Sequence, residues 1–112
     1  MALTTTVEML RRAQEQHYAV GAFNVENMEM AQAIVQAAEE LHAPVILQTT
    51  PSTVRYAGTS LYLANVAALA REANVPVAMH LDHGDSFELC VSALRAGYTS
   101  VMIDGSKLPL EE

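Results

Sequence analysis

The sequence predicts an α/β fold in which helices cover a parallel β-sheet. Four short apolar runs alternate with longer amphipathic segments, and the runs stay apolar along their length instead of alternating with polar residues. Strands that are buried on both faces have this composition, and they occur in parallel sheets with helical crossovers. In addition, every run ends in polar residues, which bears on where a ligand would bind.

The first predicted elements are a helix and a strand. Thr5 is followed three residues later by Glu8, a capping-box signature that predicts a helix ending at about Gln16. Residues 19–23 then form an apolar run that ends at Asn24. This run is the first predicted strand.

A second helix and a second strand follow. Asn27 can cap the helix, whose predicted apolar face consists of Met28, Ala31, Val35, Ala38 and Leu41. Pro44 ends this helix and starts the second strand, residues 45–47, which continues into polar residues 48–50. Pro51 and Ser52 are predicted to form a turn.

The second half of the chain repeats the same unit. Residues 60–74 are rich in Ala and Leu and predict a helix, and residues 76–83 predict the third strand. Residues 85–96 predict a helix that Gly97 ends, and residues 100–103 predict the fourth strand. The predicted order is α(βα)₃β.

Size and composition favour a single domain over residues 1–112. The chain is 51% hydrophobic, enough for one modest core, and it contains no linker or low-complexity stretch. Its net charge of −7 comes from scattered acids without a Lys/Arg cluster, so nucleic acid is excluded as a partner.

The sequence also predicts a cytoplasmic protein without membrane partners. No apolar run approaches the length needed to cross a bilayer, and the start of the chain lacks the order of a signal peptide. The single cysteine, Cys90, lies in an amphipathic segment, where we expect a buried, reduced thiol.

Polar residues stand at the end of each predicted strand. They are Asn24 after the first strand, Thr49 and Thr50 after the second, Asp82 and His83 after the third, and Asp104, Gly105 and Ser106 after the fourth. In parallel α/β folds, ligands bind beyond the carboxyl ends of the strands, so these side chains should converge. The convergence predicts a functional site.

Asp82 and His83 carry the clearest chemistry among these residues. A neutral imidazole can ligate zinc, and a neighbouring carboxylate can move a proton or orient a ligand. His80 should lie beneath Asp82 on the same face. Taken alone, Asp82 could begin a turn, His83 could be an exposed side chain and Asp104 could form a turn with Gly105, and only their position at strand ends favours a site.

Four segments resemble one enzyme family over nearly the whole chain. Residues 18–24, 43–47, 76–84 and 97–106 are similar to the N-terminal part of the class II, zinc-dependent ketose-bisphosphate aldolases. The greatest similarity is to the bacterial fructose- and tagatose-1,6-bisphosphate aldolases. The resemblance implies a TIM (β/α)₈ barrel, of which this chain would be about the first half.

The resemblance also implies an activity and roles for individual residues. The activity is aldol cleavage or condensation of a ketose 1,6-bisphosphate in glycolysis and carbohydrate metabolism, a lyase reaction that yields dihydroxyacetone phosphate and glyceraldehyde 3-phosphate. His83 resembles a zinc ligand and Asp82 the catalytic acid/base. Asp104 matches a metal position that can hold a second cation, divalent or monovalent. Asn24 and Thr50 match substrate-binding positions, the latter near the aldehyde-side phosphate.

The resemblance covers only part of such an enzyme. A full barrel takes roughly 250 residues, and the family's further zinc histidines and ketone-side phosphate segments belong to its second half. His17 and His42 are expected on helix ends away from the site. We therefore expect the isolated chain to be inactive and to bind zinc weakly or not at all.

Two other functions are compatible with the pattern. A half-barrel would expose the edges of its first and fourth strands, so the chain could be a non-catalytic fragment that assembles through them, and a homo-oligomer is expected. A phospho-receiver domain would suit the length and the strand-end aspartate, but it needs an acidic pair after the first strand, where this chain has Asn24, Val25 and Glu26.

Overall fold

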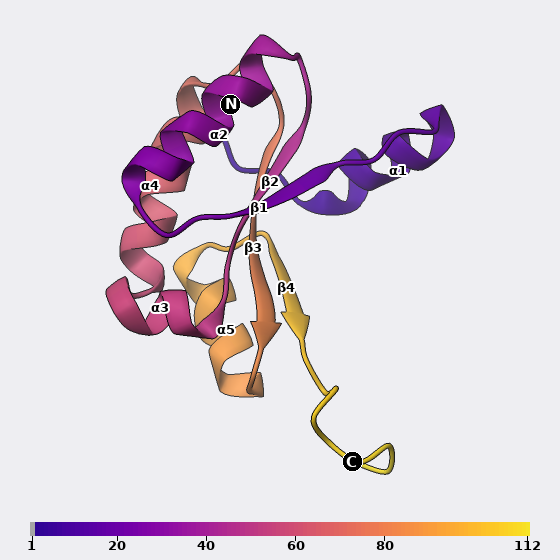
Figure 1. Cartoon of the computed structure of the whole chain (residues 1–112), viewed down its shortest axis with the longest axis vertical. Helices are drawn as coiled ribbons and strands as arrows, with labels where there is room; N and C mark the ends of the chain where they lie inside the picture. Colours follow the sequence, from indigo (N-terminus) through magenta and orange to yellow (C-terminus); the bar gives the residue numbers. More distant parts are fainter. Residues whose placement is uncertain (1) are drawn as a thin grey trace.

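The computed structural model of the chain describes residues 2–112. Its centre is a single four-stranded parallel sheet in which each strand pairs with the next one in sequence (Figure 1). The strands are β1 (Gly21–Asn24), β2 (Val45–Thr49), β3 (Val77–Gly84) and β4 (Ser100–Ile103). The predicted parallel α/β sheet is confirmed, because every crossover between strands is helical.

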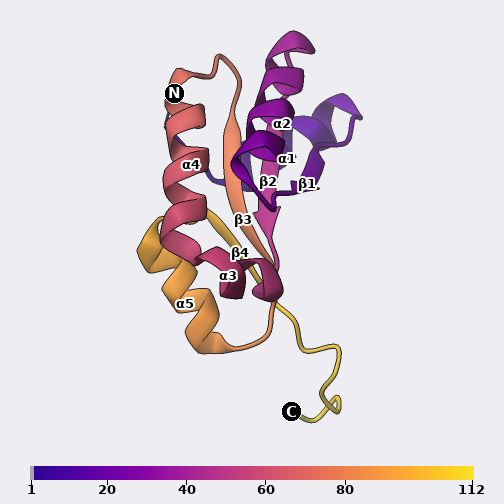
Figure 2. The same ribbon diagram turned by 60° about the vertical axis from the view of Figure 1, so that its left-hand side comes forward.

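The helices lie on two sides of this sheet. They are α1 (Thr6–Gln16), α2 (Met28–Glu40), α3 (Pro51–Ala57), α4 (Thr59–Glu72) and α5 (Phe87–Ala96). Helices α2, α4 and α5 cover one face, and α1 lies on the other side of the sheet (Figures 1 and 2). We call these faces the helix-covered face and the open face.

The main core lies between the sheet and the helix-covered face. Leu47, Met79 and Leu81 are completely buried there, and Val35 of α2 and Val66 of α4 belong to the same cluster. Burying one large apolar side chain stabilises a fold by about 1.5–3 kcal/mol, so this layer fixes the strands. The free cysteine Cys90 is buried in the same cluster, as predicted.

Helix α1 covers the beginning of the strands on the open face. Met9 packs there against Ile46 of β2 and Ala78 of β3, with Val20 at the border. Beyond this small cluster the open face turns polar toward the carboxyl ends of the strands. The apolar contacts therefore close one end of the sheet and leave the other end for polar side chains.

The predicted cap of α2 at Asn27 is confirmed, and Ser86 caps α5 in the same way. The Asn27 side chain accepts a hydrogen bond from the Met30 backbone N–H (2.8 Å), and Ser86 accepts one from the Leu89 N–H (3.1 Å). Each cap satisfies a backbone donor that the first helical turn leaves unpaired. Caps fix where α2 and α5 begin, and therefore where β1 and β3 must end.

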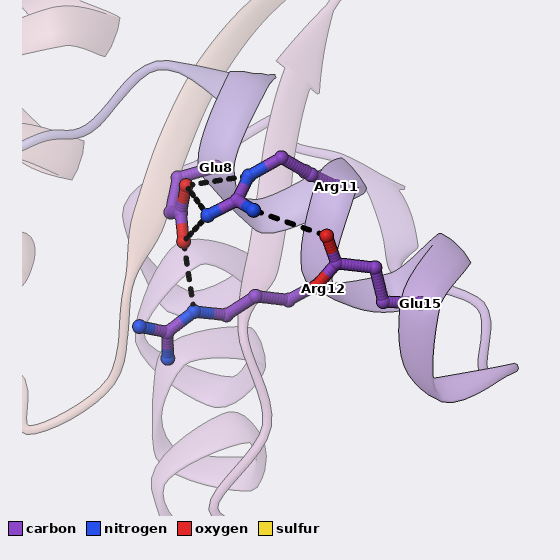
Figure 3. A network of polar contacts seen from close by, with 4 residues as sticks. All are labelled: Glu8, Arg11, Arg12 and Glu15. Atoms are coloured by element: carbon purple, nitrogen blue, oxygen red, sulfur yellow. Dashed lines mark hydrogen bonds and ion pairs between the residues drawn. The ribbon is translucent and has the colours of Figure 1, made fainter.

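The predicted capping box at α1 is wrong in its side-chain contacts. Thr5 stands at the N-cap but makes no side-chain cap hydrogen bond. The Glu8 carboxylate instead accepts hydrogen bonds from Arg11 (2.7 Å) and Arg12 (3.0 Å), and Arg11 also contacts Glu15 (Figure 3). Hydrogen bonds from Arg11 and then Arg12 lower the pKa of Glu8. The charge of the two arginines therefore competes successfully for the carboxylate.

The predicted apolar face of α2 is correct in the middle and wrong at its ends. Ala31, Val35 and Ala38 are buried, whereas Met28 and Leu41 are 51% and 77% exposed. Both exposed residues border open hollows on the surface instead of the packed core. A helix longer than the layer beneath it leaves its terminal apolar residues uncovered.

The predicted turn at Pro51 and Ser52 is also wrong, because these residues begin helix α3. Thr50 is the extended N-cap residue, and Pro51 occupies the first turn. Proline fits this position since its fixed φ suits a helix and its missing N–H would be unpaired there anyway. The predicted order thus gains a short helix between β2 and α4.

Strands β1 and β4 form the two edges of the sheet, as predicted. Within residues 2–112 each of them pairs on one side only, and Phe23 and Ile103 remain 50% and 60% exposed. None of the helices described here has both the length and the apolar character required to cross a membrane.

Candidate active site at the carboxyl ends of the strands

Polar contacts join the carboxyl ends of all four strands. The Gln48 Nε2 group of β2 donates to Asn24 Oδ1 of β1 (2.7 Å) and to Asp82 Oδ2 of β3 (3.2 Å). His83 Nε2 lies 3.6 Å from Asp82 Oδ2, and His83 Nδ1 lies 2.9 Å from Asp104 Oδ2, just after β4. The structure therefore brings Asn24, Asp82, His83 and Asp104 together.

Gln48 is a member of this network that the sequence reasoning missed. It pairs in register with Asn24 on one side and with His80 on the other, so its side chain lies on the same face as theirs. The sequence did contain a signal for Gln48. It is a polar residue that directly follows an apolar run, and the alternation along a strand places it on the same face as the site residues. Its amide connects β1 to β3 through hydrogen bonds.

The backbone at the end of β3 is bent, which brings both Asp82 and His83 to the site. His83 has φ +53°, in the left-handed region, and the register with β4 shifts between Leu81 and Gly84. A non-glycine residue in this region costs on the order of 1–3 kcal/mol and persists where surrounding contacts impose it. Without the bend, neighbouring strand residues would point to opposite faces.

Electrostatics favour a charged pair of His83 and Asp104. The hydrogen bond to Asp104, and then the charge of Asp82, raise the pKa of His83. Hydrogen bonds from Ser106, whose N–H lies 2.9 Å from Asp104 Oδ1, and then from His83 hold the pKa of Asp104 well below its usual range. Nδ1 is thus hydrogen-bonded to Asp104, whereas the Nε2 atom of His83 has only the longer, 3.6 Å contact with Asp82.

This arrangement fits one part of a zinc site. Zinc-bound histidines commonly direct their second ring nitrogen to a carboxylate, as His83 does to Asp104. Residues 2–112 contain no group of three or more His, Cys, Asp or Glu side chains that could hold a metal ion together. His17 and His42 follow the ends of α1 and α2, as predicted, so they do not supply further ligands here.

His80 has a supporting position beneath Asp82, as predicted. Its Nδ1 atom lies 2.6 Å from the Ser100 hydroxyl of β4, and the residue is partly buried. Burial lowers the pKa of His80, although the charge of Asp82 opposes this shift. His80 thereby links β3 to β4 one layer below the mouth.

The two threonines at the end of β2 have different surroundings. Thr49 is buried toward the helix-covered face, where its hydroxyl lies 2.9 Å from the Tyr98 hydroxyl. Thr50 Oγ1 lies 3.2 Å from Ser52 Oγ and 3.1 Å from Thr53 Oγ1. Of these two threonines, Thr50 is the one that directly precedes α3.

A hollow of about 380 Å³ opens beside His83. Its walls come from α3, from the ends of β3 and β4, and from the segment after β4; they are Pro51, Ser52, Arg55, His83, Asp85, Asp104, Lys107 and Leu108. This hollow provides space for a ligand in direct contact with the candidate metal ligand. We call it the mouth hollow.

Comparison with known proteins decides the family. The model of the family described as "Fructose-bisphosphate aldolase class-II" matches residues 4–112. The chain belongs to the class-II fructose-bisphosphate aldolase family. The chain is 55% identical to the fructose-bisphosphate aldolase of Thermus caldophilus, over 93% of the chain and 34% of the relative. It is 53% identical to the probable fructose-bisphosphate aldolase of Bacillus subtilis, over the whole chain and 40% of the relative.

Solved structures match the chain over a similar share of their length. The YdjI aldolase of Escherichia coli K12 superposes with a TM-score of 0.91 at 34% identity, covering 98% of the chain and 42% of that protein. A putative fructose-1,6-bisphosphate aldolase of Coccidioides immitis superposes with a TM-score of 0.88 at 33% identity, covering 96% of the chain and 38% of that protein. The fold is thus the N-terminal part of a TIM barrel, as predicted, and spans about two fifths of these relatives.

Proposed function

We propose that residues 1–112 supply the N-terminal part of a zinc-dependent aldolase active site that acts on a ketose 1,6-bisphosphate. The products of cleavage would be dihydroxyacetone phosphate and glyceraldehyde 3-phosphate. The observation that carries this proposal is the row of Asp82, His83 and Asp104 at the carboxyl ends of the strands, in which His83 is hydrogen-bonded to Asp104 and lies 3.6 Å from the Asp82 carboxylate. A purely structural strand end has no need for such a row.

His83 is the residue that would hold the zinc ion, through Nε2. When bound, the metal supplies polarisation of the substrate's ketone carbonyl. Asp104 keeps the His83 ring in one orientation through the 2.9 Å hydrogen bond to Nδ1. In the same proposal the Asp104 carboxylate is near enough to take part in holding a second cation, divalent or monovalent.

Asp82 would transfer the proton. In cleavage its carboxylate accepts the proton of the hydroxyl on the aldehyde-forming carbon while the adjacent carbon–carbon bond breaks, and the electron pair of that bond stays with the ketone half. In condensation Asp82 returns the proton to the new hydroxyl. Its side chain is 21% exposed and is held by the Gln48 amide, so it is both reachable and oriented.

Asn24 and Thr50 would lie on the substrate side of the site. Asn24 is fixed by the Gln48 hydrogen bond at the end of β1, and Thr50 is the N-cap residue of α3. Fructose and tagatose bisphosphates differ at one stereocentre, and the curated relatives include a 6-phospho-5-dehydro-2-deoxy-D-gluconate aldolase at 48% identity. We propose fructose bisphosphate first, because the two relatives at 55% and 53% identity carry that name.

A chimaera tests this proposal. Residues 1–112 would replace the matching 40% of the Bacillus subtilis relative, so that the barrel is complete. We expect the purified chimaera to cleave fructose 1,6-bisphosphate, to lose this activity in a chelator and to regain it with added zinc. Cleavage that persists after complete metal removal would contradict the proposal.

The exposed strand edges favour a second candidate, a non-catalytic fragment that assembles through them. Phe23 on β1 and Ile103 on β4 leave apolar surface beside unpaired backbone groups. Sedimentation velocity of the 112-residue chain distinguishes the two: concentration-dependent association supports assembly, and a folded monomer contradicts it. A homo-oligomer is proposed for the same reason, and a cytoplasmic location because the one cysteine is buried and unpaired.

A further inference from the structure

We propose that two copies of this chain close one eight-stranded parallel barrel, in which β4 of each copy pairs with β1 of the other. This pairing rests on the second candidate above, assembly through the strand edges, and names its partner, its register and its end point. It needs neither zinc nor substrate, so it is independent of the aldolase chemistry.

The sheet already has the curvature of a closed barrel, because nearly the whole chain superposes closely on a solved aldolase of this fold. A TIM barrel closes with eight parallel strands, and this sheet contains four strands in sequence order. The chain therefore makes up half of the ring. A second copy has the number, direction and curvature of strands that the other half requires, and after two copies no edge remains free.

Both edge strands lack the features that normally prevent pairing. Natural proteins place Lys, Pro or inward-pointing charges on exposed strand edges. Neither Gly21–Asn24 of β1 nor Ser100–Ile103 of β4 contains a charged residue or a proline. In addition, Phe23 and Ile103 expose apolar surface at the two edges. The two edges are therefore suited to pair with another strand.

The register of the new junction follows from the pairing within the sheet. One row of paired residues crosses all four strands and consists of Asn24, Gln48, His80 and Ser100. In a TIM barrel such a row is displaced by about eight residues after a full turn, and so by about four after half a turn. Displacement toward the start of β1 places Ser100 opposite residue 20 of the second copy, and Ile103 opposite Phe23. Displacement the other way would place Ser100 opposite a residue of α2, where no strand is available.

This register also matches the faces of the two sheets. Phe23 pairs with Leu47 of the main core, so its side chain lies on the helix-covered face. Val101 packs against the same core, and Ile103, two residues further along β4, lies on that face too. Two apolar side chains, Phe23 and Ile103, thus meet on one face. A register shifted by one residue would send them to opposite faces.

An apolar hollow of about 390 Å³ beside Phe23 provides space for this contact. It lies between β1 and α2, and Ile34, Leu41 and Val45 belong to its walls. In the closed pair, Ile103 of the second copy would enter this hollow. The two-fold symmetry repeats the contact at the second junction, so each edge residue contributes twice to the stability of the dimer.

Sedimentation equilibrium of the purified 112-residue chain tests the assembly. We expect a dimer, with twice the mass of the chain, as the largest species. Ile103→Lys should weaken dimerisation by about 100-fold, because apolar contacts are lost at two junctions and each edge gains a charge. The matched control is Leu61→Lys on α4, where a leucine of similar exposure (66%, against 60% for Ile103) lies away from both edges. It should leave dimerisation unchanged.

Disulfide cross-linking tests the register, in a chain that carries Cys90→Ala. The pair Ile103→Cys and Phe23→Cys should link the two copies on oxidation. The pair Met102→Cys and Phe23→Cys should not, because neighbouring strand residues point to opposite faces. Circular dichroism establishes that each variant is folded.

Three results would overturn the proposed dimer. They are a folded monomer at every concentration, an open series of larger species, and a dimer that Ile103→Lys leaves intact. A folded monomer would not affect the aldolase proposal, since the relative supplies the other half of the barrel in the chimaera. Conversely, an inactive chimaera would leave the sedimentation result unchanged.

Discussion

Asp82 and His83 are neighbours in sequence, but their contacts suit them to different tasks. Asp82 is held from the side by the Gln48 amide and is partly buried, whereas His83 is 61% exposed and is held from behind by Asp104. The left-handed backbone at His83 allows both side chains to face the same space. These surroundings fit the roles that we propose, proton transfer for Asp82 and metal binding for His83.

Asp82→Asn should separate these two tasks. The amide keeps the shape of the side chain but cannot accept the proton, so cleavage by the chimaera should fall by about 10²–10⁴-fold, the usual contribution of general acid–base catalysis. Zinc content, measured by atomic emission, should not change. Glu88→Gln, an exposed change in the first turn of α5, is the matched control. If Asp82→Asn kept full activity, the assignment of the acid/base would be wrong.

Tyr98 leads to a prediction about alkaline pH. Burial raises the pKa of Tyr98 above its ordinary value, and the hydrogen bond with Thr49 opposes this only in part. The unfolded chain therefore releases this proton at lower pH than the folded chain, so stability is present below about pH 10 and is lost as the pH rises between the two pKa values.

Tyr98→Phe removes this titration. In urea unfolding it should cost about 1 kcal/mol at neutral pH, since one buried hydrogen bond is lost, and it should make stability fall less steeply above about pH 10. Tyr62, whose pKa burial also raises, remains in both proteins and sets the residual slope. An unchanged alkaline slope in Tyr98→Phe would show that Tyr98 is not the group responsible.

Among the elements, the strand order and most helices could be predicted, because the spacing of apolar residues and the capping residues are local signals. Asn27 and Ser86 cap the expected helices, and β4 has its predicted bounds. Helix α3 was missed because proline favours both turns and first helical turns, and only tertiary contacts decide between them. The role of Gln48 was missed because the network that it joins depends on the register of three strands.

The junction of β3, α5 and β4 can be tested at Gly84. A Cβ atom added there would lie 2.6 Å from the Met102 carbonyl oxygen and 2.7 Å from Cys90 Sγ. Gly84→Ala should therefore destabilise the chain by about 1–3 kcal/mol in urea unfolding, the usual cost of overpacking. Gly105→Ala is the matched control, because nothing lies within 4 Å of its added Cβ. Equal stabilities of the two variants would contradict this close packing.

At the scale of the whole molecule, one end of the sheet is covered by apolar contacts and the other end carries polar side chains. Met9 of α1 packs on Ile46 and Ala78 at the start of the strands, and the polar network occupies the opposite end. The family and the first part of the barrel could be predicted from sequence, since both depend on local motifs at strand ends. Whether the site is complete depends on the whole barrel. The chain covers only about two fifths of the length of the relatives that have this fold.

We propose that this chain contributes His83 and Asp82 to a zinc site whose other ligands lie outside residues 1–112. Zinc titration followed by calorimetry tests it most directly, with the isolated chain and the chimaera measured side by side. We predict weak or no binding to the chain, and stoichiometric, tight binding to the chimaera that His83→Ala abolishes. Tight, stoichiometric zinc in the isolated chain, or tight zinc in the His83→Ala chimaera, would contradict the account.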